Sequence, residues 1–174
     1  MRRFSLYSKN QGERCFPPQG RLGAVAQIRG SDKYPDIRGV VRFYYTRGGT
    51  VVQAEIRGLP SYLPALGGNP PRGPFGFHIH SMAKCGSPAS PEPCMAAGGH
   101  FDIGENPHGN HAGDLPVLFS NKGVAMMSVY TSRFTPEQVI GRTVMIHEHP
   151  DDFRTQPAGD SGERIACGEI LRAE

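Results

Sequence analysis

GVVRFYYTRGGTVVQAEI, residues 39–56, carries the clearest secondary-structure signal in the chain. Its two halves, 39–45 and 50–56, are rich in β-branched and aromatic residues, which favour strands. Arg47-Gly48-Gly49 lies between them and has the composition of a tight turn, because glycine adopts backbone angles that most residues avoid. The stretch therefore predicts a β-hairpin.

Further strand-like runs lie on both sides of this hairpin. They cover residues 22–28, 75–80, 123–131, 142–147 and 164–171. Thr135-Pro136-Glu137-Gln138 could open one helical turn, but the chain shows no sustained helical period. About eight short strands of this kind predict an all-β fold, an antiparallel sandwich or barrel.

Composition and charge fit one turn-rich domain. The 174 residues include 23 glycines and 16 prolines, which suits short strands joined by loops. Residues 1–20 are polar and lack periodicity, so we expect a flexible N-terminal extension before a single domain at 21–174. The net charge of +3 is too small to indicate nucleic-acid binding, and no apolar run approaches the ~18 residues of a membrane span.

The start of the chain and its cysteines bear on the cellular compartment. Met1-Arg2-Arg3 could begin a signal peptide, but the apolar core that should follow is missing. The chain as written is therefore expected to be cytoplasmic, and an exported form stays open if the start is truncated. The four cysteines allow three connectivities if all pair, and they include no C-x2-C pair, so no thiolate zinc site is expected.

The histidines carry the strongest functional signal. Five of the seven lie between residues 78 and 111, and a sixth, His147, ends the 142–147 run. A neutral imidazole can bind a metal ion without the cost of burying a charge. His78 and His80 lie two residues apart on a strand, so both rings point to the same face while Ile79 points into the core.

A second motif, HGNHAGD at residues 108–114, places His108, His111 and Asp114 three residues apart, and its glycines let the loop curl around an ion. Two or three imidazoles and one carboxylate form a closed, structural zinc site. His100 could supply the third nitrogen of this site. Four imidazoles suit Cu(II) instead, and His100 could also be the fourth of these if its ring bridges two ions.

In this order the motifs resemble the copper/zinc superoxide dismutases, in particular the bacterial type. The matching segments are Gly76–His80, Gly98–Phe101, His108–Leu115, Gly141–His147 and Gly162–Gly168. The resemblance extends from about residue 22 to the end of the chain. It implies a Greek-key antiparallel β-sandwich or barrel with long metal-binding and polar loops.

The resemblance also implies which residues form the site. The implied copper ligands are His78, His80, His100 and His147, and the implied zinc ligands are His100, His108, His111 and Asp114. Arg164 matches the arginine that docks superoxide beside copper. Asp151 matches the carboxylate that hydrogen-bonds one ligand histidine of each metal, a contact that orients the rings.

By resemblance, the activity is the conversion of two superoxide anions and two protons to dioxygen and hydrogen peroxide. Copper cycles between Cu(II) and Cu(I), zinc is structural, and the counterpart of His100 leaves copper to carry a proton.

The alternative is a copper-binding or copper-transfer protein on the same fold. A transfer protein usually carries an M-x-C-x-x-C motif, which this chain lacks, and has no need of Arg164. A zinc hydrolase is a weaker alternative, because a closed zinc site has no position for water. The oligomeric state stays open, with a homodimer among the options.

For the disulfide, Cys167 matches the family's cysteine in the last strand. Its partner is ambiguous, because Cys85 lies where bacterial members have theirs and Cys94 lies where eukaryotic members have theirs. We expect Cys85–Cys167, which leaves Cys94 as a buried free thiol and Cys15 unpaired in the extension. The alternative is that all four cysteines are reduced in a cytosolic setting.

Overall fold

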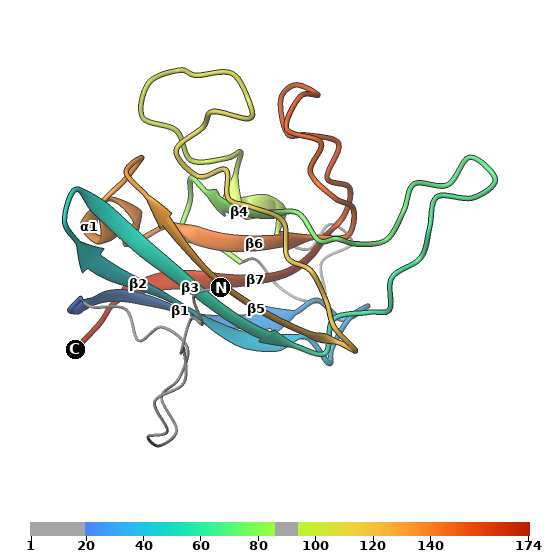
Figure 1. The fold of residues 1–174 in the computed structure, drawn as a ribbon, viewed down its shortest axis with the longest axis horizontal. Helices are drawn as coiled ribbons and strands as arrows, with labels where there is room; N and C mark the ends of the chain where they lie inside the picture. Colours follow the sequence, from blue (N-terminus) through green and yellow to red (C-terminus); the bar gives the residue numbers. More distant parts are fainter. Residues whose placement is uncertain (1–19, 86–93) are drawn as a thin grey trace, which may run out of the picture.

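The computed structural model describes residues 20–85 and 94–174 and shows an almost entirely β protein (Figure 1). The strands are β1 (Leu22–Gly30), β2 (Arg38–Thr46), β3 (Gly49–Arg57), β4 (Phe77–His80), β5 (Val124–Thr131), β6 (Thr143–His147) and β7 (Arg164–Arg172). Single helical turns form η1 (Met95–Ala97) and α1 (Pro136–Val139). All seven strand runs predicted from the sequence are present, and so is the helical turn.

The predicted hairpin is formed by β2 and β3. These strands pair antiparallel from Arg38↔Arg57 to Thr46↔Gly49, and Gly48 in the turn has a φ of 79°. The side chains alternate as the pattern requires, with Val41, Phe43 and Val52 fully buried. The hairpin therefore forms one wall of the core.

The strands join one curled antiparallel sheet in the order β4-β6-β7-β1-β2-β3-β5. β4 and β5 lie at opposite edges, β6 lies next to β4, and β3 lies next to β5. Each of the connections β3–β4, β4–β5 and β5–β6 therefore crosses from one side of the sheet to the other. Apolar side chains from both halves of the curl meet inside it, among them Phe43 from β2 and Val144 from β6. The prediction of an antiparallel all-β fold is confirmed.

The strand count is the one difference from the expected eight. The segment before β5 contributes only isolated bridges, Phe75↔Leu118 and His78↔Asp114, and the first has N···O distances of 2.9 and 2.8 Å in its two hydrogen bonds. Pro116 cannot donate a backbone hydrogen bond, which opposes a longer ladder here. Within the described residues, an eighth strand is thus reduced to isolated bridges.

Two of the long loops lie on one side of the molecule, over β4 (Figure 1). They are the yellow-green loop that follows η1 and the orange-red loop between β6 and β7. All four residues of β4 are buried, because the sheet covers one face of the strand and these loops cover the other. Polar side chains on this strand are therefore shielded from water.

Two predictions fall outside this description. Residues 1–19 and Cys15 within them are not described, so the division into an extension at 1–20 and a domain at 21–174 stays a prediction. Among the residues that the structure does cover, no helix is both long enough and apolar enough to cross a lipid bilayer.

Candidate metal centre

Strand pairing brings together the histidines of β4 and β6. His78 and His80 flank Ile79, which is fully buried as predicted, and His80 Nε2 lies 3.3 Å from His147 Nε2. A register shift after Ile146 pairs His147 with Arg164 of β7. The sheet therefore places three imidazoles and one guanidinium at the same end of the molecule.

His100 joins this group through backbone pairing of its loop with β4. His80 and His100 form an isolated antiparallel bridge, and the Phe101 amide donates to the Ile79 carbonyl over 2.7 Å. The rings of His78 and His100 then stack with their centroids 3.9 Å apart. One ligand atom from each of His78, His80, His100 and His147 lies within 4.8 Å of the others.

The loop motif closes a second group around Asp114. Its Oδ1 lies 2.9 Å from His100 Nδ1, 3.3 Å from His108 Nδ1 and 3.5 Å from His111 Nδ1. Its Oδ2 accepts the amide protons of Gly109 (2.8 Å) and His111 (3.0 Å). The loop is thus wound around the carboxylate, and His100 belongs to both groups.

Asp151 connects the two groups. Its Oδ2 lies 2.7 Å from His78 Nε2, and its Oδ1 lies 2.9 Å from His108 Nε2. Burial alone would raise the pKa of Asp151, but the hydrogen bonds with His78, the Phe153 amide and His108 outweigh it and hold this pKa below its usual value. A buried carboxylate in this position fixes both ring orientations and tautomers.

Backbone carbonyls hold the two remaining rings. His80 Nδ1 lies 2.8 Å from the Gly98 carbonyl, and His147 Nδ1 lies 3.3 Å from the Gly162 carbonyl. The opposite nitrogen of each ring is then directed at the other histidine.

Several ring nitrogens are buried without any hydrogen-bond partner. Among the described residues they are His78 Nδ1, His100 Nε2, His108 Nδ1 and His111 Nδ1. A buried polar atom without a partner costs about 1–3 kcal/mol of stability. Four such nitrogens in one place therefore indicate that they bind something other than protein atoms, such as metal ions. An all-imidazole group suits copper, and a group of three imidazoles and one carboxylate suits zinc, so the donor sets fit both metals.

Burial also keeps the rings in the form that binds metal. It lowers the pKa of His78 to about 4 and the pKa of His80 to about 2. For the same reason the pKa of His147 falls well below its ordinary value. These imidazoles are therefore neutral at pH 7, and each keeps a lone pair for a metal ion.

We expect the metal-free protein to lose stability as the pH falls from 6.5 toward 4. Histidines in the unfolded chain bind protons below about pH 6.5, whereas His78 stays neutral in the folded chain down to about pH 4. Acid therefore favours the unfolded state, by about 3 kcal/mol for His78 alone. The check is the thermal midpoint of metal-free protein between pH 7.5 and 4.5, with metal-loaded protein as the control. An unchanged midpoint between pH 7 and 5 would contradict this expectation.

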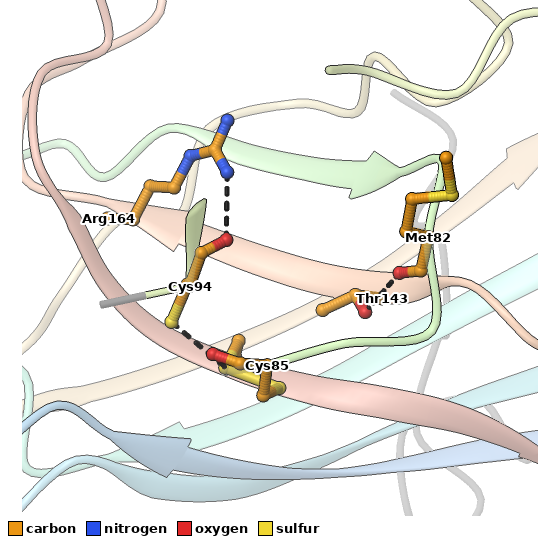
Figure 2. Close-up of a disulfide and its surroundings, with 6 residues drawn as sticks. Met82, Cys85, Cys94, Thr143 and Arg164 are labelled. Carbon is orange, nitrogen blue, oxygen red and sulfur yellow. Dashed lines mark hydrogen bonds between the residues drawn. A yellow bond between two sulfur atoms is a disulfide. The ribbon is translucent and has the colours of Figure 1, made fainter. Parts of the chain in front are cut away.

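Arg164 lies next to the four-histidine group. Its guanidinium donates to the Cys94 carbonyl over 2.8 Å, as Figure 2 shows, and to the Gly98 carbonyl over 2.7 Å. With His147 and Gly162 it lines a pocket of about 290 Å³. Burial lowers the pKa of Arg164 from its usual value, but an arginine with two carbonyl acceptors stays cationic at neutral pH.

The predicted disulfide is confirmed. Cys85 and Cys167 are bonded across 82 residues of sequence (Figure 2). The bond ties the loop after His80 to the last strand. Cys94 is buried and free, also as predicted.

Sequence reasoning missed several residues that hold the site. Asp102 accepts the amide protons of Asn106 (2.6 Å) and Ala112 (3.1 Å), which braces the loop from inside. Arg133 donates to the carbonyls of His111 (3.1 Å) and Asp114 (3.4 Å) from outside. The position of Asp102, only two residues after His100, could have indicated that this carboxylate supports the metal-site loop. No sequence pattern indicated the contacts of Arg133 or those of the Gly98 and Gly162 carbonyls.

Comparison with known proteins agrees with this geometry. The family model described as copper/zinc superoxide dismutase matches residues 37–170. The chain is 35% identical to the Cu-Zn superoxide dismutase of Deinococcus radiodurans over 154 residues, which cover 79% of each chain. It is 35% identical to that of Legionella pneumophila, covering 84% of this chain and 85% of the relative. It is 40% identical to Cu-Zn superoxide dismutase 2 of Salmonella typhimurium, covering 70% and 78%. The chain belongs to the copper/zinc superoxide dismutase family, whose cofactors are copper and zinc.

Proposed function

We propose that this protein is a superoxide dismutase, with two adjacent metal sites that share His100. The proposed copper ligands are His78, His80, His100 and His147, and the proposed zinc ligands are His100, His108, His111 and Asp114. The observation that carries the proposal is the set of buried ring nitrogens without partners, which belong to these two groups. Family membership and the names of the relatives support the same activity.

When bound, copper supplies a one-electron couple, Cu(II)/Cu(I), and zinc supplies a fixed positive charge that orders the loop. The protein's part is to hold each donor in place. Asp151 fixes His78 and His108 together, and the Gly98 carbonyl fixes His80. Because these contacts use the nitrogen of each ring that faces away from its group, the other nitrogen is left for the metal.

Arg164 is the proposed anion-docking residue. Two carbonyl oxygens hold its guanidinium in one orientation beside His147, and it lines the same pocket as that histidine. Its charge attracts a small anion such as superoxide and holds it at the edge of the four-histidine group. Both half-reactions begin with superoxide, so each benefits from the same docking position.

His100 is the proposed proton carrier. Asp114 holds its Nδ1 at 2.9 Å, and its Nε2 has no protein partner. A ring anchored through one nitrogen can bind and release a proton at the other without moving far. This position supplies one of the two protons that hydrogen peroxide requires, and the second comes from solvent.

The test is a dismutase assay on protein loaded with both metals. We expect activity that azide and cyanide inhibit, because small anions compete with superoxide beside Arg164. Zinc-only protein, with metal content measured by mass spectrometry, is the matched control and should be inactive. Full occupancy of both sites with activity no higher than that of free copper would reject the enzyme and leave the copper-binding alternative.

A further inference from the structure

A third sulfur lies against the disulfide. Cys94 Sγ is 3.1 Å from Cys167 Sγ, the sulfur already bonded to Cys85 (Figure 2). Cys94 and Cys167 are only 4% and 6% exposed and belong to one buried cluster with Ala97 and Met145, against which the partly buried Cys85 packs. The three sulfurs thus lie together, and Cys167 contacts both of the others.

The length of the loop that the disulfide closes favours neither Cys85 nor Cys94 as the partner of Cys167. Cys167 lies 82 residues from Cys85 and 73 residues from Cys94. The entropy of closing a loop depends on the logarithm of its length, so loops this similar restrict the unfolded chain almost equally. Local geometry in the folded protein therefore decides between Cys85 and Cys94.

We propose that Cys94 is a nucleophile that replaces Cys85 as the partner of Cys167, so that the chain holds two interchangeable disulfides. The Cys94 thiolate attacks Cys167 Sγ, the Cys94–Cys167 bond forms, and the Cys85–Cys167 bond breaks. Cys85 leaves as a thiolate and takes up the proton that Cys94 lost. The exchange neither gains nor loses electrons, so it needs no outside oxidant or reductant.

The position of Cys94 favours the reaction and its environment slows it. A thiol in contact with its target has a high effective concentration, and bond formation needs an approach of only about 1 Å. Burial, however, raises the pKa of Cys94 to about 11, with Arg164 acting in the opposite direction. Arg164 donates to the Cys94 carbonyl and is the charged group that acts on this pKa, while Ala97 and Met145 belong to the same buried cluster as Cys94.

The backbone of Cys94 contacts Arg164 beside the metal centre. The Cys94 carbonyl accepts hydrogen bonds from Arg164 (2.8 Å) and from the Ala97 amide (3.1 Å). Cys94 has a φ of 67°, an angle that non-glycine residues adopt only when their surroundings impose it. The residue proposed to change the disulfide is therefore also the one whose carbonyl anchors Arg164.

The experiment is non-reducing peptide mapping of the full chain carrying Cys15→Ser, which removes the fourth cysteine from the analysis. Oxidised protein is incubated at pH 8, 9 and 10, then quenched in acid, and its free thiols are trapped with N-ethylmaleimide in denaturant. We expect a Cys94–Cys167 peptide to accumulate while Cys85 becomes trapped. The initial rate should rise about tenfold per pH unit, because the thiolate fraction does so below a pKa of about 11.

Two variants in the same background serve as controls. Cys94→Ser should retain only the Cys85–Cys167 peptide at every pH. Cys85→Ser, oxidised with glutathione disulfide, should form Cys94–Cys167 and so provide the reference peptide. The proposal is overturned if Cys85→Ser keeps Cys94 and Cys167 as free thiols. It is equally overturned if this reference peptide never appears in protein that contains all three cysteines.

Discussion

Asp114→Ala is expected to remove zinc binding and to destabilise the loop that carries His108 and His111. The carboxylate contributes one of the four proposed zinc ligands, and even the loss of a supporting contact lowers metal affinity by about 10- to 100-fold. Its other oxygen accepts two backbone amides, Gly109 N and His111 N, which the alanine leaves without partners. Their loss costs the metal-free protein about 2–5 kcal/mol of unfolding free energy.

Asp114→Asn is the matched control for these two roles. Its carbonyl oxygen can still accept the Gly109 and His111 amides, but it carries no charge for zinc. We therefore expect Asn to lose zinc almost as completely as Ala while the metal-free protein keeps most of its stability. Metal content by mass spectrometry and denaturant unfolding of metal-free protein separate the effects. An unchanged zinc stoichiometry in Asp114→Ala would show that the proposed zinc site is wrong.

Arg164→Ile is expected to lower the dismutase rate at least about tenfold at low salt, with copper and zinc content unchanged. Electrostatic steering, for which superoxide dismutases are an established example, changes association rates by about 10- to 1000-fold. The loss should shrink as salt is added, because ions screen the attraction over about 8–10 Å at physiological ionic strength. Pulse radiolysis at several salt concentrations measures both effects.

Arg164→Lys separates the charge from its placement. Lysine keeps the positive charge but cannot donate to the Cys94 and Gly98 carbonyls with the same planar fork. We expect a rate between those of the wild type and Arg164→Ile, with the salt dependence retained. Equal rates for wild type and Arg164→Ile at low salt would remove Arg164 from the docking role.

The strands could be predicted because their signals are local. In β2 and β3 each residue alternates between the core and the outer face, and the turn needs one glycine at positive φ. The same two-residue period correctly placed Ile79 in the core between two histidines. The eighth strand could not be judged this way, because its isolated bridges depend on which residues of a distant segment lie opposite Phe75 and His78.

The types of metal-binding side chain could also be predicted from the sequence, but their arrangement in space could not. The spacing of His108, His111 and Asp114 indicated a closed zinc site without any fold. That Asp151 contacts His78 and His108 was implied only by resemblance, because the three residues are separated by 73 and 43 positions. Crossings of the chain from one side of the sheet to the other bring them together.

Residue types and short spacings alone established that this chain is all-β and carries copper- and zinc-type donors. Tertiary structure decided which donors share a centre, which ring nitrogens stay free, and which cysteine meets Cys167. The physical reason is the range of the interactions. Strand periodicity and ligand spacing act over a few residues, whereas sheet register and loop packing act across the whole chain. Cys85 and Cys94 show this most directly: each fits one branch of the family, resemblance to the bacterial members favoured Cys85, and the fold shows Cys167 bonded to Cys85 with the Cys94 sulfur 3.1 Å away.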